Sequence, residues 1–207
     1  MHFLNHIKFL LMSALLLFTS STYANSILVM GDSLSAAYNL KVNQGWVSLL
    51  ENTPDFQKTN YSIINASVSG ETTQGGLARL NALLKTHSPS IVILELGAND
   101  GLRGYPLNKT KGNLANMIEQ SLAHNADVLL IGNRIPPNYG KRYTNQFFTL
   151  FQSLSEQYEL EAYVPFMLDN VALNDSLMLD DGLHPNPEGQ QYVLKNIMPF
   201  LMPMLSK

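Results

Sequence analysis

The chain has 207 residues, a formal net charge of −3 at neutral pH and no cysteine. This weakly acidic charge gives no support to nucleic acid or an anionic membrane surface as a partner. The absence of cysteine excludes disulfides and a cysteine nucleophile, and the length fits one domain with one hydrophobic core.

Residues 1–24 have the layout of a secretory signal peptide. Lys8 is followed by a ten-residue apolar stretch at 9–18 and a small, polar run at 19–24. A membrane anchor is the alternative, but a bilayer span needs about 20 apolar residues. No cysteine follows the cut before Asn25, so a lipid anchor there is excluded. We therefore expect a periplasmic or secreted domain at residues 25–207 with no stable membrane anchor.

Short apolar runs alternate with helical patterns along the rest of the chain. Residues 27–30, 61–65, 91–96 and 128–131 are typical of buried parallel strands, and 161–164 is a weaker fifth candidate. Apolar stripes within 77–84, 114–122 and 147–158 predict helices, as does the segment at 187–201. This order predicts an α/β fold, a three-layer α/β/α sandwich with a mostly parallel five-stranded sheet.

Small and polar residues follow four of these strands, at 31–35, 65–72, 97–101 and 132–134. In parallel sheets the ligand crevice lies at the carboxyl ends of the strands, so a functional site is expected there. Ser33, directly after the first strand, is either a helix N-cap or a nucleophile. The motif around it lacks the second glycine of the G-x-S-x-G elbow, which argues against an α/β-hydrolase.

His184 is the candidate base for such a serine. Asp181, three residues upstream in a Gly/Pro-bounded turn, is placed to orient the imidazole, although it could simply cap the turn. A zinc site on Asp180, Asp181 and His184 is disfavoured because no further histidine lies in a comparable loop. His87 and His124, the other histidines after residue 24, fall at the ends of polar helical segments.

Two further residues could stabilise an oxyanion. Gly70 can bring its backbone N–H close to a substrate because it lacks a Cβ, and Asn99 offers a side-chain amide. A plain turn glycine and an Asx turn remain the alternatives for these two positions.

Taken together, the four blocks resemble the SGNH hydrolase family, also called the GDSL esterase/lipase family. The family's four defining residues match Ser33, Gly70, Asn99 and His184 in order, with a D-x-x-H pattern from Asp181. The resemblance covers essentially all of residues 25–207. It implies the flavodoxin-like SGNH hydrolase fold, with Ser33, Asp181 and His184 as catalytic residues. It also implies an oxyanion hole formed by Ser33, Gly70 and Asn99, and neither metal nor cofactor.

The resemblance further implies a serine esterase that hydrolyses acyl esters and thioesters through an acyl-enzyme on Ser33. Substrates of the acyl-CoA thioesterase, lysophospholipase or arylesterase type would then be small-molecule partners of a monomer. The alternatives are a carbohydrate O-acetylesterase and a catalytically dead lipid- or glycan-binding module. A helix starting at Ser33 would add its dipole to the stabilisation of the oxyanion.

The acyl chain is expected to bind between two loops. The loop at 101–106 has glycines at 101 and 104 and carries Leu102 and Tyr105. It suggests a lid or groove wall, with a plain surface loop as the alternative. Ile135 and Pro136 supply apolar side chains from the loop after the fourth strand.

Overall fold

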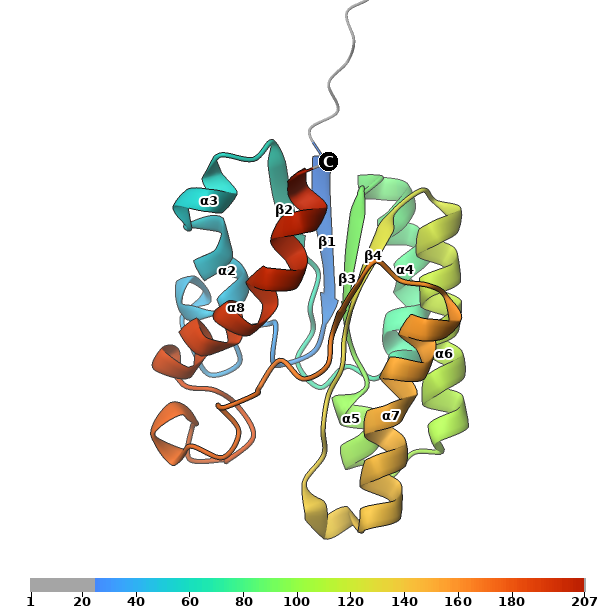
Figure 1. The fold of residues 1–207 in the computed structure, drawn as a ribbon, viewed down its shortest axis with the longest axis vertical. Helices are drawn as coiled ribbons and strands as arrows, with labels where there is room; N and C mark the ends of the chain where they lie inside the picture. Colours follow the sequence, from blue (N-terminus) through green and yellow to red (C-terminus); the bar gives the residue numbers. More distant parts are fainter. Residues whose placement is uncertain (1–24, 207) are drawn as a thin grey trace, which may run out of the picture.

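The computed structural model describes residues 25–206 as a five-stranded parallel sheet between two layers of helices (Figure 1). The strands are β1 (Asn25–Gly31), β2 (Tyr61–Asn65), β3 (Ile91–Glu95), β4 (Asp127–Ile131) and β5 (Ala162–Val164). Their order in the sheet is β2-β1-β3-β4-β5, and every neighbouring pair is parallel. The predicted fold class and all five predicted strands are confirmed, whereas the predicted signal peptide lies outside the described residues.

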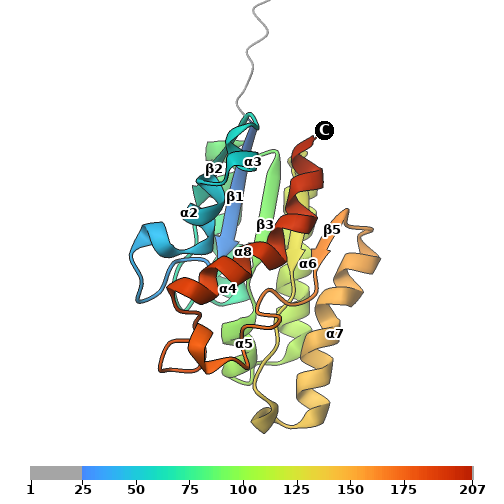
Figure 2. The ribbon, with the colours of Figure 1, turned by 60° about the vertical axis from the view of Figure 1, so that its left-hand side comes forward.

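Helices cover both faces of the sheet. One face carries α4 (Thr73–His87), α6 (Leu107–Ala123) and α7 (Lys141–Gln157), and the other carries α2 (Trp46–Glu51), α3 (Pro54–Gln57) and α8 (Pro187–Leu201). Figure 2 shows α8 crossing in front of the sheet. The short helix α5 (Ala98–Leu102) follows β3. Four 3₁₀ helices complete the described elements: η1 (Val42–Gln44), η2 (Pro137–Tyr139), η3 (Asp175–Leu177) and η4 (Met202–Ser206).

The interior strand β1 contributes to two hydrophobic cores. Ile27 and Val29 pack into the core shared with α2 and α8, while Leu28 and Met30 pack into the core shared with α4, α6 and α7. Successive side chains of a strand point to opposite faces, so an unbroken apolar run is what a strand covered on both faces requires. Because all strands are parallel, their carboxyl ends meet at one end of the molecule, the lower end in Figure 1.

The segment after Ser33 differs from the prediction, because no α-helix starts there. The backbone N–H of Ala36 reaches the carbonyl of Asp32 at 3.0 Å, but Ala37 and Asn39 then adopt left-handed φ values of 56° and 55°. Residues 33–39 are consequently a series of turns, and the first α-helix after β1 is α2. The expected contribution of a helix dipole at Ser33 was therefore wrong.

No helix within residues 25–206 has both the length and the apolar character needed to cross a membrane.

Candidate active site

Three side chains predicted to act together are hydrogen-bonded in series at the carboxyl end of the sheet. Nε2 of His184 lies 2.8 Å from Oγ of Ser33, and Nδ1 of His184 lies 2.7 Å from Oδ2 of Asp181. Both ring nitrogens are thus engaged, one by the candidate nucleophile and one by the carboxylate. The alternatives in which Ser33 only caps a helix, or Asp181 only caps a turn, do not account for these contacts.

A tight turn holds Asp181 against the imidazole. The N–H of Leu179 donates to the carbonyl of His184 at 2.7 Å, and Gly182 takes a left-handed φ of 66° inside the turn. Oδ1 of Asp181 accepts the N–H groups of Leu183 and His184 at 2.9 and 3.0 Å. The D-x-x-H spacing therefore lets one carboxylate fix both the turn and the ring.

The electrostatics keep this carboxylate ionised. Partial burial acts to raise the pKa of Asp181, but the hydrogen bonds from Leu183 and His184 outweigh it and the pKa is lowered. Asp180, by contrast, is exposed and makes no hydrogen bond or ion pair with any residue in 25–206. No cluster of three metal-ligating side chains is present in that same range.

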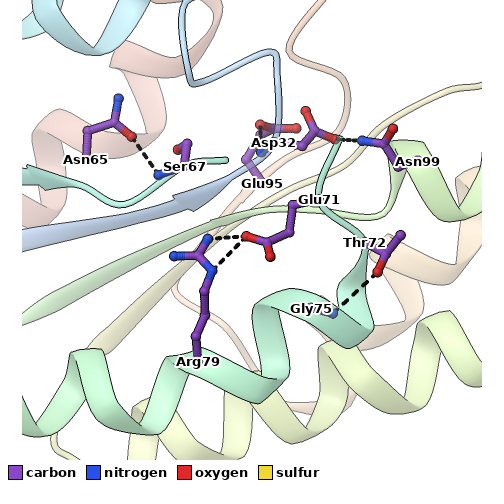
Figure 3. A network of polar contacts seen from close by, with 9 residues as sticks. All are labelled: Asp32, Asn65, Ser67, Glu71, Thr72, Gly75, Arg79, Glu95 and Asn99. Atoms are coloured by element: carbon purple, nitrogen blue, oxygen red, sulfur yellow. Dashed lines mark hydrogen bonds and ion pairs between the residues drawn. The ribbon is translucent and has the colours of Figure 1, made fainter. Parts of the chain in front are cut away.

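The two candidate oxyanion donors are tied to the residues around Ser33. Nδ2 of Asn99, in the first turn of α5, donates to Oδ2 of Asp32 at 3.0 Å (Figure 3). Gly70 has a left-handed φ of 79°, and its carbonyl accepts Nη2 of Arg103 at 3.1 Å. These bonds leave one amide hydrogen of Asn99 and the N–H of Gly70 available to a ligand.

The loop that carries Gly70 is anchored at both ends. The N–H of Val68 donates to the carbonyl of Gly31 at 3.0 Å, which holds the loop against the end of β1. On the other side, Glu71 is paired with Arg79 of α4, as Figure 3 shows. Because both anchors lie within a few residues of Gly70, the orientation of its N–H is set by the surrounding structure.

A buried carboxylate links α5 to the start of α4. Asp100, next to Asn99, accepts the N–H of Thr73 at 2.9 Å and its hydroxyl at 2.5 Å, and the hydroxyl of Thr110 at 3.3 Å. Thr73 lies three residues after Gly70, so this contact holds the two candidate oxyanion donors, Gly70 and Asn99, in place relative to each other.

Sequence reasoning missed two residues beside the candidate triad. The ring of Tyr38 lies 4.5 Å from that of His184, centroid to centroid, at an angle of 38°. The left-handed backbone of Ala37 and Asn39 on either side turns Tyr38 over the imidazole. Left-handed conformations at two non-glycine residues one position apart are costly, and such strain gathers at functional sites. An aromatic residue five positions after a nucleophile carries no signal by itself.

Glu95 is the second missed residue, at the end of β3. Its Oε2 accepts the hydroxyl of Ser35 at 2.7 Å and the N–H of Asp32 at 3.3 Å, while Oε1 has no partner in residues 25–206. Burial, and then repulsion from Asp32, raises the pKa of Glu95 well above its ordinary value. Burial likewise raises the pKa of Asp32 to about 6. A lone acid at the end of a buried apolar run was the signal available in the sequence.

The burial of Glu95 makes the free energy of unfolding depend on pH. The folded protein holds a proton on Glu95 that the unfolded chain releases above its ordinary pKa of 4.5, so the free energy of unfolding falls as pH rises from there. Glu95→Gln removes this dependence. Urea unfolding should show the variant gaining stability relative to the wild type between pH 5 and pH 8. The control is Glu51→Gln, a substitution of an exposed glutamate. If the free energy of unfolding of Glu95→Gln differed from that of the wild type by the same amount at pH 5 and at pH 8, the assignment would be contradicted.

A cavity of about 670 Å³ opens beside Ser33, Asn99 and His184. Leu102, Ile135 and Pro136 line it, as predicted for an acyl groove. Its other large apolar lining residues are Leu34, Phe148, Phe166, Leu168, Leu173, Met178 and Leu183. Most of these additional lining residues come from the segment after β5, whose role the sequence did not indicate. Gly70 lies outside the lining residues.

The prediction for Tyr105 was wrong. Tyr105 is 42% exposed and does not line the cavity, and its carbonyl accepts the hydroxyl of Tyr143 at 3.0 Å. The reason is that α5 extends to Leu102, which changes the direction of the chain before residue 105. The hydroxyl of Tyr139 also donates to the carbonyl of Leu102 at 2.7 Å. These bonds hold the segment from Leu102 to Tyr105 in place, which argues against a mobile lid.

Gly101 is required for close packing, not as a hinge. A Cβ at this position would lie 2.7 Å from Ile135 and 2.8 Å from Phe147. We expect Gly101→Ala to destabilise the protein by about 1–3 kcal/mol, the usual cost of overpacking a core. The matched control is Gly112→Ala in α6, where a Cβ meets nothing within 4 Å and a gain of about 0.5–1 kcal/mol is expected. Thermal unfolding of both variants measures these changes in stability. An equal shift of the unfolding midpoint in the two variants would contradict the packing role of Gly101.

A serine, a histidine and an aspartate hydrogen-bonded in series, beside free N–H donors and an apolar cavity, are typical of serine hydrolases. The model of the GDSL-like lipase/acylhydrolase family matches residues 29–192, and the chain belongs to this family.

Its relatives include named ester hydrolases. The chain is 44% identical to esterase TesA of Pseudomonas aeruginosa over 192 residues, which cover 93% of this chain and 95% of the relative. It is 39% identical to thioesterase 1/protease 1/lysophospholipase L1 of Escherichia coli K12 over 201 residues, or 97% and 94% of the two chains.

The solved structures agree with the sequence relatives. The crystal structure of the psychrotrophic esterase EstA from Pseudoalteromonas sp., inhibited by monoethylphosphonate, superposes with a TM-score of 0.83 at 42% identity. The match covers 88% of this chain and all of that chain. The chain therefore has the fold and the relatives of an SGNH-family esterase.

Proposed function

We propose that the protein is a serine esterase that hydrolyses medium-length acyl esters and thioesters through an acyl-enzyme on Ser33. The observation that carries the proposal is the 2.8 Å contact between Oγ of Ser33 and Nε2 of His184, made beside a largely apolar cavity of about 670 Å³. Residues supplying a nucleophile, a base and an orienting carboxylate are all within hydrogen-bond reach, as acyl transfer requires.

The first half of the reaction forms the acyl-enzyme. Oγ of Ser33 attacks the carbonyl carbon while its proton passes to Nε2 of His184, and Asp181 stabilises the resulting imidazolium. The negative charge that develops on the carbonyl oxygen is stabilised by the N–H groups of Ser33 and Gly70 and by the amide of Asn99. The alcohol or thiol leaves with the proton that His184 returns to it.

The second half releases the acid. Water attacks the acyl carbon with His184 again taking the proton, and Ser33 regains its hydrogen when the second tetrahedral intermediate collapses. Asp32, through its 3.0 Å bond to Asn99, keeps the amide aimed at the oxyanion through both halves. No step in this sequence calls for a metal or a cofactor.

The apolar cavity favours acyl chains longer than acetate. Each buried methylene contributes about 0.8 kcal/mol, so kcat/KM should rise from acetate to medium-length p-nitrophenyl esters. Ile135→Ser should flatten this rise while hydrolysis of the acetate ester changes little. Activity confined to acetate would favour the carbohydrate O-acetylesterase instead, and binding without any hydrolysis would favour the dead binding module.

We further propose that the protein is exported to the periplasm or secreted after cleavage before Asn25. The proposal rests on the sequence of residues 1–24, in which Lys8, an apolar stretch at 9–18 and a small, polar run at 19–24 follow one another as in a secretory signal peptide. The N-terminal residue of the exported protein tests this, and an uncleaved chain retained in the cytoplasm would contradict it.

A further inference from the structure

Arg134 places a positive charge in the cavity that contains Ser33. It lies in the loop that follows β4, and its guanidinium carbon lies 3.7 Å from the ring centroid of Phe148 and 5.6 Å from that of Phe166. All three residues line the cavity. A guanidinium packed over a ring at this distance is held by the aromatic face, and its in-plane N–H groups remain directed outward.

These N–H groups have no partner in the protein. Within residues 25–206, no hydrogen bond or ion pair involves the guanidinium of Arg134, although its own backbone N–H donates to Oδ1 of Asn133 at 2.8 Å. Apart from His184 and the fully buried Asp32, no other charged residue lines the cavity. The cavity therefore contains a cation that packs on an aromatic ring but has free donors and no ion-pair partner within residues 25–206.

We propose that Arg134 forms a subsite for an anionic group of the substrate, a carboxylate or phosphate distant from the ester carbon. This rests on the proposed function, because the ligand must reach Ser33 and Arg134 within the same cavity. The planar fork of a guanidinium matches the oxygens of carboxylates and phosphates and binds them with two parallel hydrogen bonds. Arg134 would then select among esters without touching the reacting atoms.

The negative net charge of the protein makes the positive charge of Arg134 important for binding an anionic substrate. The chain carries a formal charge of −3, so an anionic substrate gains nothing from the overall field of the protein. Its affinity would have to come from a contact inside the cavity. The guanidinium of Arg134 is exposed to solvent, which limits the expected effect to roughly that of one charge-assisted hydrogen bond, about tenfold in kcat/KM.

The test compares neutral and anionic esters in the wild type and in Arg134→Met, which keeps an unbranched stem over Phe148. The neutral reference is p-nitrophenyl butyrate. One anionic arm places the carboxylate on the acyl chain (mono-p-nitrophenyl glutarate), and the other places it on the leaving group (3-carboxy-4-nitrophenyl butyrate). The arm that is affected shows which side of the ester reaches Arg134.

We expect Arg134→Met to lower kcat/KM about tenfold for at least one anionic ester and less than twofold for the neutral ester. Arg134→Lys, which keeps the charge without the planar fork, should fall between the two. Arg142→Met, an arginine of α7 outside the cavity lining, is the control and should leave all three rates unchanged.

Equal changes for neutral and anionic esters, or no change for either, would overturn the subsite. Normal hydrolysis of the neutral ester in both proteins would then show that the proposed esterase function survives. Failure of the wild type to hydrolyse any of the three esters would instead overturn the proposed function itself.

Discussion

Ser33→Ala is expected to abolish hydrolysis of p-nitrophenyl esters, with a fall in kcat on the order of 10⁴-fold or more. The hydroxyl of Ser33 is the only atom of the candidate triad that can form the acyl-enzyme, and the methyl side chain of alanine cannot replace it. Ser33 is partly buried and, within residues 25–206, its hydroxyl bonds only to His184, so the thermal unfolding midpoint should change little.

The matched control for this substitution is Ser62→Ala, because Ser62 is an exposed serine on β2. Its activity should equal that of the wild type. Retention of even a tenth of the wild-type rate by the Ser33→Ala protein would show that another group is the nucleophile.

Asp181→Asn should lower kcat by about 10³- to 10⁴-fold, whereas Asp180→Asn should change it less than twofold. The two acids are neighbours in the chain, but only Asp181 contacts the imidazole, at 2.7 Å from Nδ1. An amide in its place would present N–H to that nitrogen and favour the tautomer in which Nε2 carries the hydrogen. His184 could then no longer take the proton of Ser33.

Steady-state kinetics of the two variants side by side measure this difference, and Asp180→Asn serves as the matched control. Thermal unfolding should show both variants folded at the assay temperature. The opposite ranking, with Asp180→Asn the slower enzyme, would mean that the turn around residues 179–185 is threaded differently in solution.

The sheet could be predicted because burial on both faces leaves a direct trace in the sequence. A strand such as β3, whose five residues are all buried, must be apolar throughout. The start of α8 could also be predicted from the sequence, because Asn186 caps the helix with bonds to two backbone N–H groups and Pro187 occupies its first turn. Elements fixed by local sequence or by complete burial were therefore predicted correctly.

The short helices α2 and α3 were not predicted, for a physical reason. Each has six residues or fewer, too few for an apolar stripe to repeat. Trp46 of α2 is instead held by long-range bonds, from its N–H to Gln190 of α8 at 2.9 Å and from its indole to Ser35 at 3.2 Å. Bonds across such separations leave no periodicity in the chain.

The residues of the candidate site likewise divide into those that local sequence revealed and those that depend on long-range packing. Ser33, Asp181 and His184 could be found because each sits in a short motif beside a strand end or turn. Arg134 could not be assigned to the cavity, because its contacts with Phe148 and Phe166 depend on how α7 and the segment after β5 pack. Tyr105 was misplaced for the related reason that the sequence did not reveal α5.

Covalent labelling tests the central claim, that Ser33 carries the acyl group, most directly. The protein is incubated with a p-nitrophenyl alkylphosphonate, which transfers its phosphorus to an activated serine and releases p-nitrophenol. Peptide mass spectrometry should then find one equivalent of phosphonate on Ser33, with activity lost in proportion, and no adduct on Ser33 in a His184→Ala protein over the same time. An adduct on a different residue, or full inactivation with Ser33 unmodified, would contradict the assignment.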